Sequence, residues 1–394
     1  MNTTNELEFS KQVVEGIIQV SGGPSQLHEP ELTGKELENL RQCIETNYVS
    51  SVGNFVSEFE NLICDYTGSK YAIAVVNGTA ALHVALLLVG LKPGEEVLVP
   101  ALSFIATANA VSYCGATPHF VEVDEISLGI DFEKLENYLL EIATLENNVC
   151  VNKKTGRNIR ALIPMHTFGH PSNLVQLAAI CEKFRIELVE DAAESLGSTL
   201  GGRHTGTFGK LGALSFNGNK IITTGGGGAI LTSDHELALR ARHVTTTARV
   251  AHKWEFIHDE IGFNFRMPNI NAALGCAQIA GIESKIARKR HLFHEYSRAL
   301  NPIAGVNVFC EPKESRSNYW LQTLILEAEF EKSRDQIISL TNEQGVTTRP
   351  AWNLLNSATP YRNCPTMATP CAESLVKRII NLPSSPKLVE KFMQ

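Results

Sequence analysis

Short apolar runs alternate with longer amphipathic segments through most of the chain. Runs of about four to eight residues that are rich in Val, Ile and Leu are typical of buried strands, and apolar positions three or four residues apart are typical of helices. The expected strands are 72–76, 96–100, 119–124, 161–166, 186–191, 211–216 and 228–232. Strands that alternate with helices predict an α/β fold, with a mainly parallel seven-stranded sheet and helices on both of its faces.

The helices are expected between these strands and before them. Thr33 and Glu36 form a capping-box pattern at the start of one helix. The other helices are expected at 6–18, 56–63, 80–90, 103–111, 132–139, 174–184 and 235–244, followed by a long helix that starts at 269 and runs into the 290s. The polar residues 146–158 are interpreted as an exposed insertion, and 245–268 as an irregular segment.

The pattern changes beyond about residue 300, where short apolar runs surround a helix expected at 333–344. This change favours a smaller C-terminal α+β unit. We therefore predict two domains: residues 1–284, with the N-terminal segment and the large α/β domain, and residues 285–394.

The composition limits the classes of function. The 394 residues carry a formal net charge of −7, which argues against a nucleic-acid-binding protein because such proteins usually present a basic surface. The N-terminus has acidic residues and no long apolar run, so neither a signal peptide nor a membrane span is expected. Nine cysteines without paired spacing indicate free thiols in a cytoplasmic protein.

Chemically distinctive residues follow three of the predicted strands. Gly78 and Thr79 lie between a strand and an apolar helix, where free backbone amides and the helix dipole favour an anion. Asp191 ends another strand, and Lys220 lies five residues after Ser215 and shortly before four consecutive glycines. Each feature alone also fits an ordinary explanation, namely a strand-to-helix turn, a helix N-cap and a surface lysine before a flexible loop.

Together these residues meet the needs of pyridoxal phosphate. Ligands of open parallel sheets bind at the carboxyl ends of the strands, so the three groups are expected to lie near one another. A lysine can form an imine with an aldehyde, a carboxylate can keep a heteroaromatic nitrogen protonated, and a serine hydroxyl with helix amides can bind a phosphate. The sequence therefore predicts a pyridoxal phosphate site.

Four ordered motifs resemble the DegT/DnrJ/EryC1/StrS sugar aminotransferases, which are fold-type I pyridoxal phosphate enzymes. The motifs are E-D-A-A-E-S-L-G, S-F-N-G-N-K, T-T-G-G-G-G and G-F-N-F-R-M-P-N-I-N-A-A-L-G, and the resemblance runs from about residue 30 to the end. The segments P-M-H-T-F-G-H, T-T-G-G-G-G and H-K-W-E-F are most similar to the branch that acts on UDP-linked 4-keto-6-deoxy-N-acetylhexosamines. The resemblance thus implies the fold-type I architecture and a nucleotide-sugar substrate.

The resemblance assigns roles to residues around the cofactor ring. It implies that Lys220 forms the covalent bond to the cofactor and then carries the proton, and that Asp191 pairs with the ring nitrogen. Phe104 has the position of an aromatic residue that stacks on the ring, and His166 is implied to line the cofactor pocket.

The resemblance also assigns the phosphate end of the site. Gly78, Thr79 and Ser215 are implied to bind the cofactor's phosphate. Asn264 is implied to reach the phosphate bound in a neighbouring subunit, so a homodimer with shared active sites is expected.

One position departs from the family's pattern. Glu194 stands where the family usually has Gln or His, three residues after Asp191, and is expected to contact the ring hydroxyl of the cofactor. A carboxylate would repel a phenolate unless one of the two groups is protonated.

Other residues keep two explanations each. Trp254 and Trp352 could line the sugar-nucleotide site or pack in the protein, and Arg266 and Arg349 could meet a diphosphate or a donor carboxylate, or form salt bridges. No metal site is predicted, because the histidines within 243–258 lack ligand spacing.

These observations give one leading hypothesis and two alternatives. The leading hypothesis is a pyridoxal-phosphate-dependent aminotransferase that moves an amino group from glutamate to a nucleotide-linked 4-keto-6-deoxy sugar, with glutamate implied by the resemblance alone. The lysine decides against the family's dehydratase branch, in which histidine replaces it. The alternatives are a non-catalytic regulatory homologue and an enzyme that uses the same cofactor for a racemase or lyase reaction.

Overall fold

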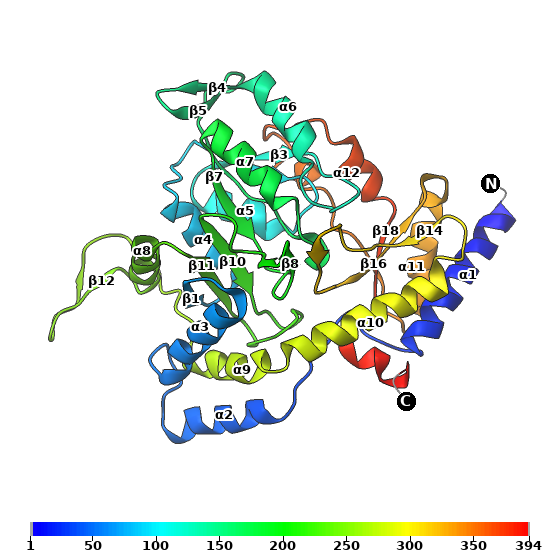
Figure 1. Cartoon of the computed structure of the whole chain (residues 1–394), viewed down its shortest axis with the longest axis horizontal. Helices are drawn as coiled ribbons and strands as arrows, with labels where there is room; N and C mark the ends of the chain where they lie inside the picture. Colours follow the sequence, from blue (N-terminus) through cyan, green and yellow to red (C-terminus); the bar gives the residue numbers. More distant parts are fainter. Residues whose placement is uncertain (1–2, 393–394) are drawn as a thin grey trace.

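Seven strands form the central sheet of the protein (Figure 1). The structure is a computed structural model that describes residues 3–392. The strands are β1 (Tyr71–Val75), β2 (Glu96–Pro100), β3 (Thr117–Val121), β6 (Ile159–Leu162), β7 (Glu187–Asp191), β10 (Leu211–Ser215) and β11 (Gly228–Thr232). Each expected apolar run supplies one of them, so the predicted sheet is confirmed.

The order of the strands is β1-β11-β10-β7-β6-β2-β3. Neighbours from β10 to β3 pair in parallel, whereas β11 runs antiparallel to both β10 and β1. The other six strands therefore share one direction, and their carboxyl ends lie at one edge of the sheet. In α/β folds this edge is where ligands bind.

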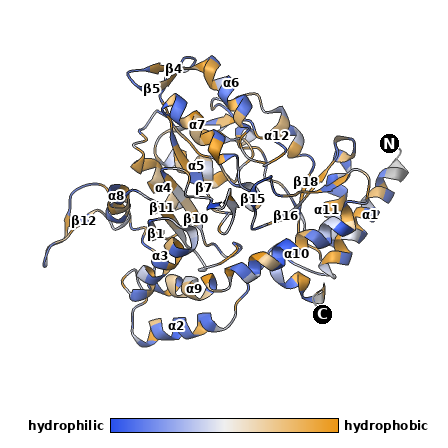
Figure 2. Cartoon of the chain, in the orientation of Figure 1, coloured by the Kyte–Doolittle hydropathy of each residue, from blue (hydrophilic) through white to orange (hydrophobic). Residues whose placement is uncertain are grey.

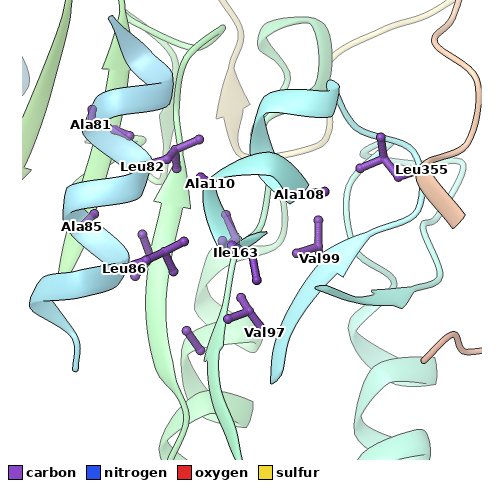
Figure 3. Packing of buried hydrophobic residues seen from close by; sticks show 14 of the residues in the cluster. Ala81, Leu82, Ala85, Leu86, Val97, Val99, Ala108, Ala110, Ile163 and Leu355 are labelled. Atoms are coloured by element: carbon purple, nitrogen blue, oxygen red, sulfur yellow. The ribbon is translucent and has the colours of Figure 1, made fainter. Parts of the chain in front are cut away.

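Helices cover both faces of the sheet because alternate strand residues point to opposite sides. On one face, α4, α5 and α8 pack on Ile73, Val75 and the strands beside them. Figure 3 shows Leu82 and Leu86 on the side of α4 that faces Ile163. The other face is covered by α3 and α9 at the β1 end, and by α6 and α7 at the β3 end. These helices are α3 (Asn54–Thr67), α4 (Gly78–Leu88), α5 (Ile105–Tyr113), α6 (Phe132–Ile142), α7 (Leu174–Phe184), α8 (His235–Thr245) and α9 (Asn269–Ile279).

The expected insertion at 146–158 is wrong in part. Its first half belongs to a hairpin of β4 (Ala143–Glu146) and β5 (Val149–Asn152). Asn152 is buried because its Nδ2 donates a 2.9 Å hydrogen bond to Oε2 of Glu96 in β2. Thr155 and Asn158 also bond Glu96 and Glu95, and Cys150 is buried under the sheet, so several tertiary contacts draw this polar segment onto it.

The segment 245–268 is mostly irregular, as expected, but it contains a second hairpin. Its strands are β12 (Arg249–Val250) and β13 (Ile257–His258). This hairpin projects from the body of the molecule (Figure 1). The side chains of Trp254 and Phe256 near its tip are 70% and 75% exposed.

A second, antiparallel sheet forms the core of the C-terminal unit. Its order is β14-β16-β18-β17, with the strands β14 (Val306–Val308), β16 (Gln322–Leu326), β18 (Ile379–Leu382) and β17 (Arg349–Pro350). The helices α11 (Arg334–Glu343) and α1 (Thr3–Ser21) pack beside it, so that Val13 of α1 shares a buried cluster with Leu324. The first helix thus lies with the C-terminal sheet (Figure 1), and the boundary between 284 and 285 stays a prediction.

The expected long helix after residue 269 is divided in two. The helix α9 ends at Ile279, and α10 (Ile282–Leu300) begins after Gly281. Ile286 of α10 is buried with the large sheet, whereas Leu292 and Tyr296 are buried with the small one. One helix therefore takes part in both cores.

Candidate active site

A cavity of about 330 Å³ lies at the carboxyl ends of the parallel strands. Its wall comes from the start of α4, the residue before α5, the end of β7 and the segment after β10. Seven of the nine expected site residues line it, namely Gly78, Thr79, Phe104, Asp191, Glu194, Ser215 and Lys220. The fold therefore brings together groups that are far apart in the sequence.

The first turn of α4 forms one end of the cavity. Asn77 caps this helix, because its Oδ1 accepts a 2.8 Å hydrogen bond from the amide of Ala80. The first amides of a helix have no intrahelical acceptor, so those of Gly78 and Thr79 can serve a ligand. Ser215 lies against this turn, since a Cβ added to Gly78 would come within 2.8 Å of the Ser215 Cβ. Amides, a helix dipole and a hydroxyl thus meet where an anion is stabilised.

The four consecutive glycines support the same turn. Gly228 begins β11 and passes so close to it that an added Cβ would lie 2.5 Å from the carbonyl carbon of Asn77. Gly225 has a φ of 78°, in the left-handed region that favours glycine. The run therefore lets the backbone turn and then pack directly against the anion-binding end.

Asp191 ends β7 inside the cavity, with 3% of its surface exposed. Its Oδ2 accepts a 2.7 Å hydrogen bond from the Thr107 hydroxyl, and its Oδ1 accepts one of 3.2 Å from the Ala193 amide. The Thr107 hydroxyl lies 2.8 Å from that of Ser103. Burial raises the pKa of Asp191, and these hydrogen bonds oppose that effect. The carboxyl group is thus fixed in orientation and shielded from water.

Lys220 reaches the cavity from a turn after β10. Its amide donates a 3.0 Å hydrogen bond to the carbonyl of Asn217, which closes the turn. Its Nζ lies 3.3 Å from Oε1 of Glu194 and 3.9 Å from the centre of the Trp320 ring. The Trp320 indole is fixed in turn, because Nε1 donates a 2.7 Å hydrogen bond to the carbonyl of Asn219. A carboxyl group and an aromatic face therefore hold the amine in place.

Glu194 is buried in the cavity wall, with 3% of its surface exposed. Its Oε2 accepts a 2.9 Å hydrogen bond from the amide of Phe168, and its Oε1 faces Lys220. Burial raises the pKa of Glu194 to about 7, although Lys220 and the Phe168 amide lower it. The group is therefore readily protonated near neutral pH, which removes the repulsion expected between a carboxylate and a phenolate.

We expect Glu194→Gln to reduce the pH dependence of stability in the cofactor-free protein. The unfolded chain loses this proton near pH 4.5 and the folded chain near pH 7. The carboxyl group therefore costs stability progressively as pH rises between these values, and the cost stays constant above them. Glutamine has no such cost, so the stability advantage of the variant should grow by about 3 kcal/mol from pH 4.5 to pH 8.

Denaturant unfolding at a series of pH values measures this effect. Glu187→Gln is the matched control, because it lies at the start of β7, the strand that ends three residues before Glu194, and is partly exposed. A stability difference between Glu194→Gln and the unchanged protein that does not vary with pH would contradict the expected titration.

His166 does not line the cavity, contrary to expectation. It is fully buried, with Nε2 3.2 Å from Oε2 of Glu190, and its Nδ1 accepts a 3.1 Å hydrogen bond from the amide of Ser172. Its own amide donates to the carbonyl of Asp191 at 3.3 Å. Because protein groups occupy both ring nitrogens, His166 fixes the backbone behind Asp191 instead.

Asn264 also lies outside the cavity. It is exposed, and its backbone forms a β-bridge with Thr246 at the base of the projecting hairpin. The role expected for it in a neighbouring subunit stays a prediction.

The structure distinguishes between the two explanations that the sequence left for each of four residues. Trp352 lines the cavity, whereas Trp254 lies on the exposed hairpin. Arg266 forms an ion pair with Glu60 at 3.5 Å, which gives it a structural role. Within residues 3–392, Arg349 has no carboxylate partner within 4 Å.

A group of possible metal ligands lies at the base of the same hairpin. The ligand atoms of His243, Asp259 and Glu260 lie within 4.8 Å of one another. His243 pairs with Asp259 at 2.7 Å, and Glu260 pairs with Arg240. These ion pairs explain the group without a metal, and the absence of a metal site stays a prediction.

Sequence reasoning missed Thr107 and Trp320, which contact Asp191 and Lys220. Thr107 lies four residues after Ser103 in a helix that the sequence predicts, so their placement on one face was available from helical spacing. Trp320 has no such signal, because it comes from the C-terminal unit and reaches Lys220 only through the tertiary fold.

The site fits pyridoxal phosphate. The lysine amine, the buried carboxyl group of Asp191 and the amide cluster of α4 surround one cavity, so an aldehyde, a ring nitrogen and a phosphate each find a partner.

The model of the DegT/DnrJ/EryC1/StrS aminotransferase family matches residues 30–394. The chain belongs to this family. GDP-perosamine synthase of Escherichia coli O157:H7 is 35% identical over 362 residues, which cover 92% of this chain and 93% of the relative. GDP-perosamine synthase of Caulobacter vibrioides is 34% identical over 364 residues, with the same shares covered. A crystal structure of a DegT DnrJ EryC1 StrS aminotransferase from Brucella abortus has a TM-score of 0.82 at 30% identity, over 91% of this chain and 92% of that one.

As a member of the DegT/DnrJ/EryC1/StrS family, the chain is a pyridoxal-phosphate-dependent aminotransferase. The predictions of family, fold type, enzyme class and cofactor are therefore confirmed. Within residues 3–392, no helix combines the length and the apolar character needed to cross a bilayer.

Proposed function

We propose that this aminotransferase moves an amino group from glutamate to the keto carbon of a nucleotide-linked 4-keto-6-deoxy sugar, as a step in bacterial surface-polysaccharide or nonulosonic acid synthesis. The observation that carries the proposal is the placement of Lys220 and Asp191 around one cavity whose wall also contains two indole rings. The names of the two GDP-perosamine synthases support a nucleotide sugar as the acceptor.

Bound pyridoxal phosphate would supply an aldehyde and an electron-accepting ring. The amides of Gly78 and Thr79 and the Ser215 hydroxyl would bind its phosphate, and Phe104 would stack on its ring. Asp191 would hold a proton on the ring nitrogen, because its oriented carboxylate favours the protonated form of that nitrogen.

Lys220 carries the proton that moves during each half-reaction, which is distinct from the one on the ring nitrogen. In the first half-reaction its Nζ removes a proton from Cα of glutamate, and in the second it delivers one to C4 of the sugar. Trp320, whose ring lies 3.9 Å from this Nζ, keeps bulk water away from it. The Glu194 carboxyl group, 3.3 Å from Nζ on another side, orients the amine.

Two acceptor classes remain within the proposal. The motif resemblance favours a UDP-linked 4-keto-6-deoxy-N-acetylhexosamine, and the 35% identity to a GDP-perosamine synthase favours a GDP-linked sugar. We propose the UDP-linked class first and the GDP-linked class second.

The test follows the visible absorbance of the bound cofactor. Glutamate should bleach it, and the correct member of a panel of UDP-, GDP- and dTDP-linked 4-keto-6-deoxy sugars, N-acetylated ones included, should restore it. If glutamate and other amino acids leave the spectrum unchanged, the chain is the non-catalytic homologue. If the spectrum changes without transfer of the amine to any sugar, a lyase or racemase is indicated.

We also propose a homodimer with shared active sites. The helix α2 (Lys35–Glu45) stands at the periphery, where hydrophobic and hydrophilic residues alternate along its ribbon (Figure 2), and its Leu37 and Ile44 are each 63% exposed. The projecting hairpin, which has Asn264 at its base, adds exposed aromatic residues near its tip. Exposed apolar residues on these two peripheral elements favour an interface there.

Subunit mixing tests this arrangement. At a cofactor concentration where Lys220→Ala and Asn264→Ala are each inactive, mixed refolding should restore about a quarter of the activity, because half of the dimers then carry one intact site. Sedimentation analysis should show a dimer. A monomer, or a mixture without activity, would contradict the shared site.

A further inference from the structure

A second cavity of about 360 Å³ adjoins the first. The two share Asn219, Trp320 and Trp352, so the cavities meet at these residues. The second cavity is lined by Leu27, His28, Asn219, Trp320, Leu321, Arg349, Pro350, Trp352 and Asn381. Arg349 is the one charged side chain in this set, and the others are apolar or neutral. The surface is therefore mostly apolar, with a few groups that form hydrogen bonds.

His28 is an unsatisfied polar residue in this wall. Both of its ring nitrogens are shielded from solvent. Neither forms a well-aligned hydrogen bond within residues 3–392, and the backbone of Asn219 supplies only a weak polar contact. Buried polar groups without partners cost stability, so their presence beside a cavity points to a ligand. The residue lies in the connection between α1 and α2.

The surroundings keep this imidazole neutral. Burial lowers the pKa of His28 well below its ordinary value, and the amines of Lys289, Lys220 and Lys285 lower it further, against a smaller effect of the Asn219 backbone. A neutral imidazole has one donor and one acceptor nitrogen. A hydroxyl group can likewise donate and accept a hydrogen bond, whereas an ionised carboxylate can only accept one.

We propose that the second cavity binds the hexose of the nucleotide sugar, and that His28 forms a hydrogen bond with a hydroxyl group of that ring. This inference rests on the proposed function and adds the place and the recognition of the sugar. A hexose has apolar C–H faces for the indoles of Trp320 and Trp352 and hydroxyl groups for His28, Asn219 and Asn381. The amino donor has two carboxylates and an ammonium group, for which the lining offers a single cation and no carboxylate.

The position of the shared wall sets the orientation of the sugar. A ring in the second cavity reaches Lys220 along Asn219, since both residues line the first cavity. Arg349 is exposed at the other side, and its Nη1 donates to Oδ1 of Asn342 at 2.8 Å. The keto carbon therefore points to Lys220, and the diphosphate leaves past Arg349 towards solvent.

The test measures the two half-reactions separately in His28→Phe, which keeps a ring and removes both nitrogens. Bleaching of the cofactor by glutamate should change less than twofold. The KM for the active 4-keto sugar nucleotide should rise about ten- to a hundredfold, as expected for a lost hydrogen bond in a buried site, while kcat changes less. His28→Gln retains a donor and an acceptor, so its KM for the sugar nucleotide should lie between those of the unchanged protein and His28→Phe. His294→Phe, at an exposed position of α10, is the matched control.

Binding of UDP-N-acetylglucosamine and of GDP-mannose to the pyridoxamine form, measured by calorimetry, gives a second readout. The sugar nucleotide that matches the acceptor should bind at least about tenfold more weakly to His28→Phe. The sugar subsite would be overturned if His28→Phe slowed both half-reactions equally, or if the folded variant bound the sugar nucleotide as tightly as the unchanged protein. If glutamate fails to bleach the unchanged protein, the proposed function fails, while calorimetry still decides the subsite.

Discussion

Replacement of Lys220 by alanine is expected to lower the transamination rate by roughly 10⁴-fold or more. The Nζ atom is the one amine that the structure places within the cavity wall beside Asp191 and the α4 amides. It both binds the aldehyde and carries the proton, so its removal eliminates two functions at once. The variant should also lack the visible absorbance of covalently attached cofactor, which spectroscopy of the purified protein measures.

Lys210→Ala provides the control for this change. Lys210 lies at the surface near the start of β10, where it pairs with Glu187 at 2.9 Å. Its loss should leave both the rate and the spectrum unchanged. Retained turnover in Lys220→Ala, or borohydride reduction that fixes the cofactor to another lysine in the unchanged protein, would refute the assignment of the amine.

Replacement of Asp191 by asparagine should lower the rate by about 10³-fold. The amide has the shape of the carboxyl group, so one oxygen can still accept the hydrogen bond from Thr107. It carries no charge, however, and therefore cannot favour a protonated ring nitrogen in a site that excludes water. Single-turnover kinetics with glutamate should show the loss in the proton-transfer step.

Thr107→Val separates the charge of Asp191 from its orientation. This variant removes the hydroxyl that donates at 2.7 Å to Oδ2 and leaves the carboxyl group itself. The Ala193 amide still holds Oδ1, so we expect a loss of about tenfold. If Asp191→Asn lowered the rate no more than Thr107→Val, the carboxylate would serve only to shape the cavity.

The sequence pattern was sufficient for the large sheet but not for every element on it. Its strands are continuous apolar runs because helices cover both faces, and such runs are visible without any tertiary information. The hairpin of β4 and β5 was hidden, because Asn152 is polar and its segment is held to the sheet by tertiary contacts such as the bond to Glu96. The division between α9 and α10 was also hidden, since helical residues continue on both sides of Gly281.

The candidate site could be predicted where its residues follow a strand or begin a helix. Asp191, Lys220 and the start of α4 all do so, and the topology of a parallel sheet then places them together. The motif that contains His166 could not show that its imidazole faces Glu190 and not the cavity. The contribution of Trp320 required the packing of the C-terminal unit on the large one, which no local pattern encodes.

The passage of α10 through both cores limits how the protein admits a bulky substrate. Because Ile286 is anchored in one core and Tyr296 in the other, a wide hinge opening between the two sheets would have to break a continuous helix or extract buried side chains. Exchange of sugar nucleotides should therefore depend on small rotations of rings at the cavity mouth, with the relative placement of the two sheets preserved during turnover.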